Sequence, residues 1–169
     1  MHVLIGYATA HGSTREIATR LAVGLGDAGL KVAVRPMAEV DDEDAYDAFV
    51  LGSAVHGQAW LDEAKDFLRR NSDLLGQRPV WLFSVGLPDA LRGPWKRMAR
   101  KEESVITEDL PGYVPYREHR LMSGVIKPGQ LSFAGRVVFR LMGSRYGDFR
   151  DWPAIDAWAG GIACELSGT

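Results

Sequence analysis

The sequence predicts a doubly wound α/β domain with a five-stranded parallel sheet. Two observations predict it. Short apolar runs of strand length alternate along the chain with longer segments whose apolar residues recur at helical spacing. The short runs are continuously apolar, which is typical of parallel strands buried on both faces by helices. No repeat, low-complexity tract or linker interrupts the pattern, so residues 1–169 are expected to form a single domain.

Each apolar run gives one predicted strand. The five strands are expected over residues 3–7, 31–36, 49–52, 80–85 and 120–126. Five such strands suit the spatial order 2-1-3-4-5, in which a ligand binds at the carboxyl ends of strands one and three.

The helices are predicted between these strands. The first follows the polar loop over residues 8–13, carries Ile17, Leu21 and Leu25 on one face, and ends near Gly29. Further helices are expected over residues 60–75, over 94–107 as a basic amphipathic segment, and over 155–166. On the last helix Cys164 lies opposite the apolar stripe, so we expect its thiol to face solvent.

Composition excludes several classes of protein. Hydrophobic residues make up 46% of the chain and charged residues 25%, as in ordinary globular domains. Cys164 is the single cysteine, so no internal disulfide is possible, and the four histidines have no metal-ligand spacing. Neither a signal peptide nor an apolar run of membrane-spanning length is visible, so a cytoplasmic location is expected.

Charge is unevenly distributed along the chain. Residues 1–91 carry 8 basic and 13 acidic side chains, whereas residues 92–150 carry 12 basic and 6 acidic ones. The basic region could meet an anionic substrate, a cofactor tail or a lipid surface, or it could be a solvated face. We expect no nucleic-acid partner.

The loop after the first strand is the first candidate site. It comprises Thr9, Ala10, His11, Gly12, Ser13 and Thr14 and opens the first helix. Backbone N–H groups and the helix dipole then point at one spot, where a phosphate would bind, with hydroxyls as further donors. An ordinary N-capped helix is the alternative interpretation. The loop lacks both the dinucleotide Gly-x-Gly-x-x-Gly pattern and the P-loop lysine motif.

This loop resembles the flavodoxin phosphate-binding pattern Ser/Thr-x-Thr-Gly-x-Thr. The match is at Thr9, Gly12 and Thr14, and His11 stands where flavodoxins usually have threonine. The resemblance extends over the chain except residues 125–150, and it implies a flavin mononucleotide (FMN) cofactor, with a deazaflavin as the alternative.

The resemblance also assigns roles to two later loops. In flavodoxins the loop after strand three covers one face of the isoalloxazine, and the loop after strand four meets its other edge. Either His56 or Trp60 could supply a stacking surface, although Trp60 could equally be the first core residue of its helix and His56 a solvated side chain. The implied cofactor-binding residues in these loops are Ala54, Val55, His56, Gly57, Trp60, Ser84, Val85, Gly86 and Leu87.

The segment over residues 125–150 departs from plain flavodoxins. Residues 131–142 can form an amphipathic helix with a broad apolar arc and with Arg136 and Arg140 together on its polar side. Such a helix could bind a partner or an interface, or it could pack on its own domain.

An insertion at this position resembles the menaquinone-dependent protoporphyrinogen oxidases, which are flavodoxin-like. The stretch Gly147–Trp152 also looks like the entry of that family into its last helix. The resemblance implies oxidation of a porphyrinogen with a quinone acceptor and peripheral contact with the inner face of the membrane. It makes Arg136, Arg140, Arg145 and Arg150 candidate partners of the substrate propionates.

Three other functions remain open from the sequence. No side chain is a convincing general acid or base, so catalysis would rest on positioning. The protein could instead be a non-enzymatic electron carrier with a redox partner, a deazaflavin-binding redox protein, or a binding module without a redox role.

Overall fold

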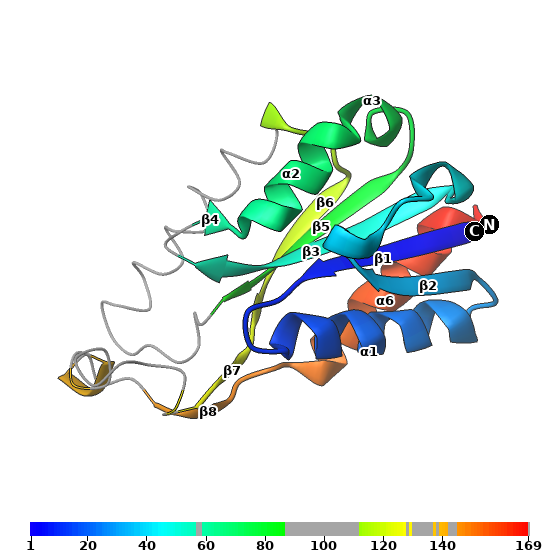
Figure 1. Ribbon diagram of the computed structural model, residues 1–169. Coiled ribbons are helices and arrows are strands. Elements are labelled where there is room, and N and C mark those ends of the chain that lie inside the picture. Colours follow the sequence, from blue (N-terminus) through cyan, green and yellow to red (C-terminus); the bar gives the residue numbers. More distant parts are fainter. Residues whose placement is uncertain are drawn as a thin grey trace.

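The computed structural model describes residues 1–56, 59–86, 112–127, 129, 137, 139–141 and 145–168 (Figure 1). The strands are β1 (His2–Ala8), β2 (Lys31–Pro36), β3 (Ala48–His56), β4 (Ala59–Trp60), β5 (Val80–Gly86), β6 (Glu118–Ser123), β7 (Val125–Ile126) and β8 (Gly147–Asp148). The helices are α1 (Ser13–Asp27), α2 (Asp62–Arg70), α3 (Ser72–Leu75) and α6 (Trp152–Ser167), with short 3₁₀ turns η1 (Met37–Glu39) and η2 (Glu43–Ala45).

The main sheet confirms the predicted fold. Its strands lie in the order β2-β1-β3-β5-β6, and each neighbouring pair on this path is parallel. The two-residue strand β4 pairs antiparallel with β3 and lies off this path. Numbered without β4, this is the predicted order 2-1-3-4-5.

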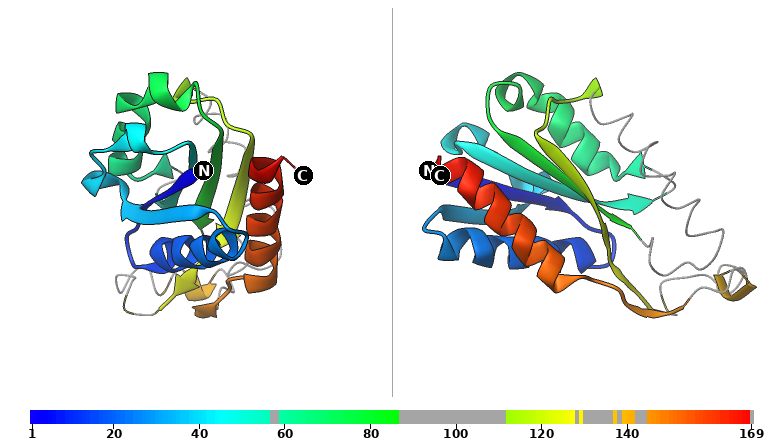
Figure 2. Two further views of the ribbon diagram at one scale, coloured as in Figure 1. Left: turned by 90° about the vertical axis from the view of Figure 1, so that its right-hand side faces the viewer. Right: turned by 180° about the vertical axis from the view of Figure 1, so that it is seen from behind.

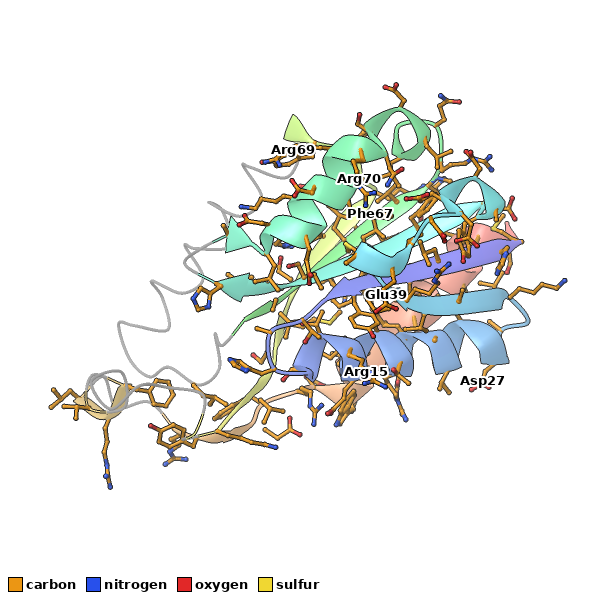
Figure 3. The ribbon with its side chains drawn as sticks, viewed as in Figure 1. Arg15, Asp27, Glu39, Phe67, Arg69 and Arg70 are labelled. Atoms are coloured by element: carbon orange, nitrogen blue, oxygen red, sulfur yellow. The ribbon has the colours of Figure 1, made fainter. Side chains whose placement is uncertain are left out.

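Helices cover both faces of the sheet, which explains the continuously apolar strands. Alternate residues of a strand point to opposite faces. Val3 and Ile5 of β1 pack with α1 and α6, whereas Leu4 between them packs with α2. Figure 2 shows α1 and α6 on one side and α2 and α3 on the other. Figure 3 shows Phe67, which is fully buried, between α2 and the sheet.

The last helix forms as the sequence predicts. Asp151 accepts the Ala154 N–H at 3.0 Å and so caps α6, and a proline stands in the first turn. The apolar stripe is buried, and Cys164 is exposed, which confirms its predicted orientation.

Two predicted elements are divided in the structure. The helix expected from residue 60 begins at Asp62, because Trp60 belongs to β4, and it is interrupted between α2 and α3. The strand expected over residues 120–126 is β6 followed by β7, and β7 leaves the main sheet to pair antiparallel with β8. The helix expected over 94–107 lies outside the described residues.

Candidate functional site

Four strands of the main sheet end at one edge, and the loops that follow them line a single cleft. The carboxyl ends of β1, β3, β5 and β6 meet there because these strands are parallel. The structure brings together residues from all three predicted loops and adds a fourth segment. The lining residues are Thr9, Ala10, His11, Ser13, Thr14, Ala54, Val55, His56, Val85, Gly86, Gly124, Val125 and Ile126.

The first loop presents an open helix N-terminus to this cleft. Gly12 has a φ of +92°, a left-handed conformation that favours glycine, and its N–H donates to Thr9 Oγ1 at 2.9 Å. Gly12 is also the N-cap of α1, which therefore has no side-chain cap. The first N–H groups of a helix have no acceptor within the helix. They are thus available to an anion.

Thr14 supplies a second indication of a ligand. Its side chain is 1% exposed, and Oγ1 has no hydrogen-bond partner in the described part of the chain. A buried hydroxyl without a partner costs stability. A phosphate oxygen at the N-terminus of α1 would accept a hydrogen bond from this hydroxyl. Neither lysine nor arginine is among the described residues of the cleft, so the donors available to a phosphate here are hydroxyl and backbone N–H groups.

The second loop contributes Val55 and His56, but Trp60 does not reach the cleft. His56 is exposed at the end of β3. Trp60 is 3% exposed, and its indole Nε1–H donates to Ser84 Oγ at 2.7 Å. Trp60 is therefore a core residue, one of the two alternatives from the sequence. His56 is then the aromatic side chain of this loop at the cleft.

The third loop separates into lining and supporting residues. Val85 and Gly86 line the cleft, whereas Ser84 is buried beneath it. The hydroxyl of Ser84 also lies 2.8 Å from His119 Nε2. Burial lowers the pKa of His119 to about 4, so its imidazole is neutral at physiological pH. The remaining predicted residues of these loops, Gly57 and Leu87, lie outside the structure's description.

The fourth segment, Gly124–Ile126, was not predicted as part of the site. Ser13 Oγ accepts the Val125 N–H at 3.2 Å, which ties this segment to the first loop. A Cβ at Gly124 would lie 3.0 Å from Val85 Cγ1 and 3.3 Å from Ser13 Cβ, so a side chain there would crowd both neighbours. The rule that ligands bind at strand ends, applied to the fifth strand, would have found it.

Part of the 125–150 segment packs on the domain, and part is exposed. Phe139 is 9% exposed and packs with Ile126, Tyr146 and Phe149. Val137 and Leu141, on the predicted apolar arc, are 46% and 82% exposed. Arg140 and Arg145 are exposed, and neither forms an ion pair with a described residue; Arg136 is not among those described. Arg150 instead pairs with Glu16 and Asp148.

Comparison with known families identifies the domain. The model of the flavodoxin domain matches residues 4–151. The chain belongs to the flavodoxin family. Membership implies a flavin cofactor and a role in electron transfer, and the orphaned Thr14 hydroxyl and open helix end fit the phosphate of such a group.

The similar proteins include a curated dehydrogenase and solved flavodoxin structures. The protoporphyrinogen IX dehydrogenase [quinone] of Escherichia coli K12 is 29% identical over 99 residues, which cover 57% of this chain and 54% of the relative. The match thus spans about half the length of that curated relative. Oxidised flavodoxin 2 from Bacillus cereus is 26% identical, with a TM-score of 0.53 over 73% of this chain and 85% of that one.

A second solved structure extends the likeness of fold to the whole chain. The flavodoxin of Streptococcus pneumoniae TIGR4 is 17% identical, with a TM-score of 0.58 over 98% of this chain and 99% of that one. At this identity the likeness concerns the fold alone. No helix in the described ranges is long and apolar enough to cross a membrane.

Proposed function

We propose that this flavodoxin-family protein binds FMN and oxidises a reduced, anionic and hydrophobic substrate of the porphyrinogen class, with a quinone as electron acceptor. The observation that carries the cofactor assignment is the unpartnered Thr14 hydroxyl beside the uncapped N-terminus of α1. FMN ends in a phosphate, which requires such donors.

Each part of the cleft has a role in this proposal. Gly12, Ser13 and Thr14 would hold the phosphate, and Val55, His56 and Gly86 of the cleft would contact the flavin ring. A flavin held in this cleft would supply two-electron redox chemistry, which is the kind needed to oxidise such a substrate and to reduce a quinone to a quinol. The residues of the cleft position the reactants and exclude water.

The substrate assignment rests on the exposed segment and the relative. Val137 and Leu141 offer apolar surface, and Arg140 and Arg145 offer positive charge on the same segment. A porphyrinogen with propionates needs both. The relative named protoporphyrinogen IX dehydrogenase [quinone] supports this class of substrate and acceptor. Membrane quinones are lipid-soluble, so peripheral contact with the inner membrane face is part of the proposal.

A non-enzymatic electron carrier is the competing function, since the solved neighbours include flavodoxins. Turnover separates the two. Purified protein, loaded with FMN under anaerobic conditions, should oxidise protoporphyrinogen and reduce a menaquinone analogue in parallel. An FMN-loaded protein that is inert in this assay, yet is reduced and reoxidised by a ferredoxin-type partner, would be a carrier. A deazaflavin would be recognised by its single absorption band in the protein as purified.

A further inference from the structure

Three side chains outside the cleft lining, the buried Trp60 and Ser84 and the partly buried His119, form a series of hydrogen bonds. Trp60 Nε1 donates to Ser84 Oγ at 2.7 Å, and Ser84 Oγ lies 2.8 Å from His119 Nε2. The three residues come from β4, β5 and β6, so the chain crosses from the hairpin at the cleft to the edge strand of the sheet.

The chemistry of the three groups gives the chain a direction. An indole N–H is only a donor, so Ser84 Oγ must accept from Trp60. The neutral imidazole of His119 can accept a hydrogen bond from the Ser84 hydroxyl at Nε2 when its own hydrogen is on Nδ1. In this tautomer Nδ1 carries the hydrogen, and Nδ1 is buried without a partner in the described part of the chain. His119 therefore binds Ser84 through Nε2 while its Nδ1 has no hydrogen-bond partner among the described residues.

Trp60, the first residue of this hydrogen-bond series, is paired with a residue that lines the cleft. Trp60 stands opposite Val55 in the β3–β4 hairpin, and Ala59 stands opposite His56. Val55 and His56 line the cleft. A second serine supports the same hairpin: Ser53, the neighbour of Ser84 in the sheet, accepts the Leu61 N–H at 3.0 Å. One buried serine thus binds the side chain of Trp60 in β4, and another binds the backbone of Leu61, which follows β4.

We propose that His119 is a positioning residue of the flavin site: through Ser84 it fixes the indole of Trp60, and thereby holds the β3–β4 hairpin in the conformation that receives the isoalloxazine. This inference rests on the proposed function for its flavin part. His119 does not line the cleft, so it acts through Ser84 and Trp60. Its effect is on cofactor affinity and hairpin order.

Variants of the three hydrogen-bonded residues test the proposal against a matched control. His119→Phe, Ser84→Ala and Trp60→Phe each remove one link. Trp158→Phe is the control, because the Trp158 indole also donates a partly buried 2.7 Å hydrogen bond, to Glu118 Oε2, but packs with α1 on the opposite face of the sheet. FMN dissociation constants, thermal midpoints, and hydrogen exchange of the Ala59, Trp60 and Leu61 amides in the apoprotein are the measurements.

The expected results distinguish positioning from general destabilisation. Each of the three variants His119→Phe, Ser84→Ala and Trp60→Phe should raise the FMN dissociation constant about tenfold, which is the usual scale for loss of a buried hydrogen bond. Each should also speed hydrogen exchange in the hairpin. Trp158→Phe should lower the midpoint similarly yet leave FMN affinity and hairpin exchange unchanged. His119→Gln, which retains an acceptor, should restore much of the affinity.

Two results would overturn the proposal. If the wild type binds FMN and the chain variants bind it equally well, or lose affinity only as Trp158→Phe does, His119 has no positioning role. Wild-type protein that binds no FMN would reject the proposed function and the flavin part of this inference together. Unchanged hairpin exchange in every chain variant would reject the positioning itself.

Discussion

A comparison with Thr19 shows how Thr14 differs from an ordinary threonine inside a helix. Thr19 donates its hydroxyl to the Arg15 carbonyl at 2.9 Å, one turn earlier in the helix. Thr14 lies in the first turn, and four residues earlier stands Ala10, which precedes the helix. No helical carbonyl is therefore in place for its hydroxyl, which remains buried and unpartnered among the described residues. Because Thr14 lies in the first turn of α1, its hydroxyl is available to hydrogen-bond a ligand.

Replacing Thr14 by valine removes this hydroxyl and keeps the shape of the side chain. We expect Thr14→Val to weaken FMN binding by about 1–3 kcal/mol, because a phosphate oxygen loses its donor. Riboflavin, which lacks the phosphate, should bind both proteins equally, and the apoprotein should be no less stable. Fluorescence titration with both flavins measures this; a parallel loss of riboflavin affinity would exclude a phosphate site here.

His119 predicts a pH dependence of stability. Its pKa in the folded protein is lowered by burial to about 4, from an ordinary value of 6.5. Between these values the unfolded chain binds the proton and the folded protein does not, so stability falls as the pH decreases from 6.5 towards 4. The full effect is of the order of 3 kcal/mol, at 1.36 kcal/mol for each pKa unit.

Urea unfolding at several pH values tests this contribution. The difference in unfolding free energy between the wild type and His119→Phe should shift in favour of the variant as the pH falls through this range. Parallel curves for the two proteins would show that the imidazole titrates normally in the folded state.

Among the elements, those with strictly local signals were predicted best. The second strand has the predicted bounds of 31–36, and α6 buries the predicted stripe. The pattern could not show that β7 pairs with β8, because the two partners are about twenty residues apart and Ile126 of β7 packs with residues distant in sequence, Phe139 and Tyr146. Trp60 fitted the helical spacing because it faces the same core as Ala64, although it belongs to a strand.

Phe139 should hold the inserted segment against the domain without supporting the main core. It lies in a small separate cluster with Ile126, Tyr146 and Phe149. We expect Phe139→Ala to increase proteolysis between residues 128 and 146 while lowering the global unfolding midpoint only slightly. Phe67→Ala, in the core under α2, should cost about 3–5 kcal/mol of global stability. Equal global losses would show that the segment unfolds together with the core.

At the scale of the whole molecule, two of the described arginines in the basic second half pair with acids from other parts of the sequence. Arg117 pairs with Glu165 of α6, and Arg150 pairs with Glu16 of α1. These partners are remote in sequence, so the charge count alone could not reveal them. Arg140 and Arg145 form no such pair within the described ranges, and they lie on the segment that exposes Val137 and Leu141.

This distribution predicts binding to an anionic membrane through the inserted segment. Wild-type protein should co-sediment with vesicles containing phosphatidylglycerol but not with vesicles of phosphatidylcholine alone, and added salt should weaken the binding. Combining Arg140→Glu with Leu141→Asp should reduce binding about tenfold or more, since it reverses a charge and removes an apolar contact. Val23→Asp is the matched control, because Val23 is an exposed apolar residue (51%) that belongs to α1 and not to the inserted segment. FMN content should be unchanged in every variant. Wild-type protein that stays in the supernatant with both vesicle types, or a control variant that binds as weakly as the double variant, would leave the exposed residues without a membrane role.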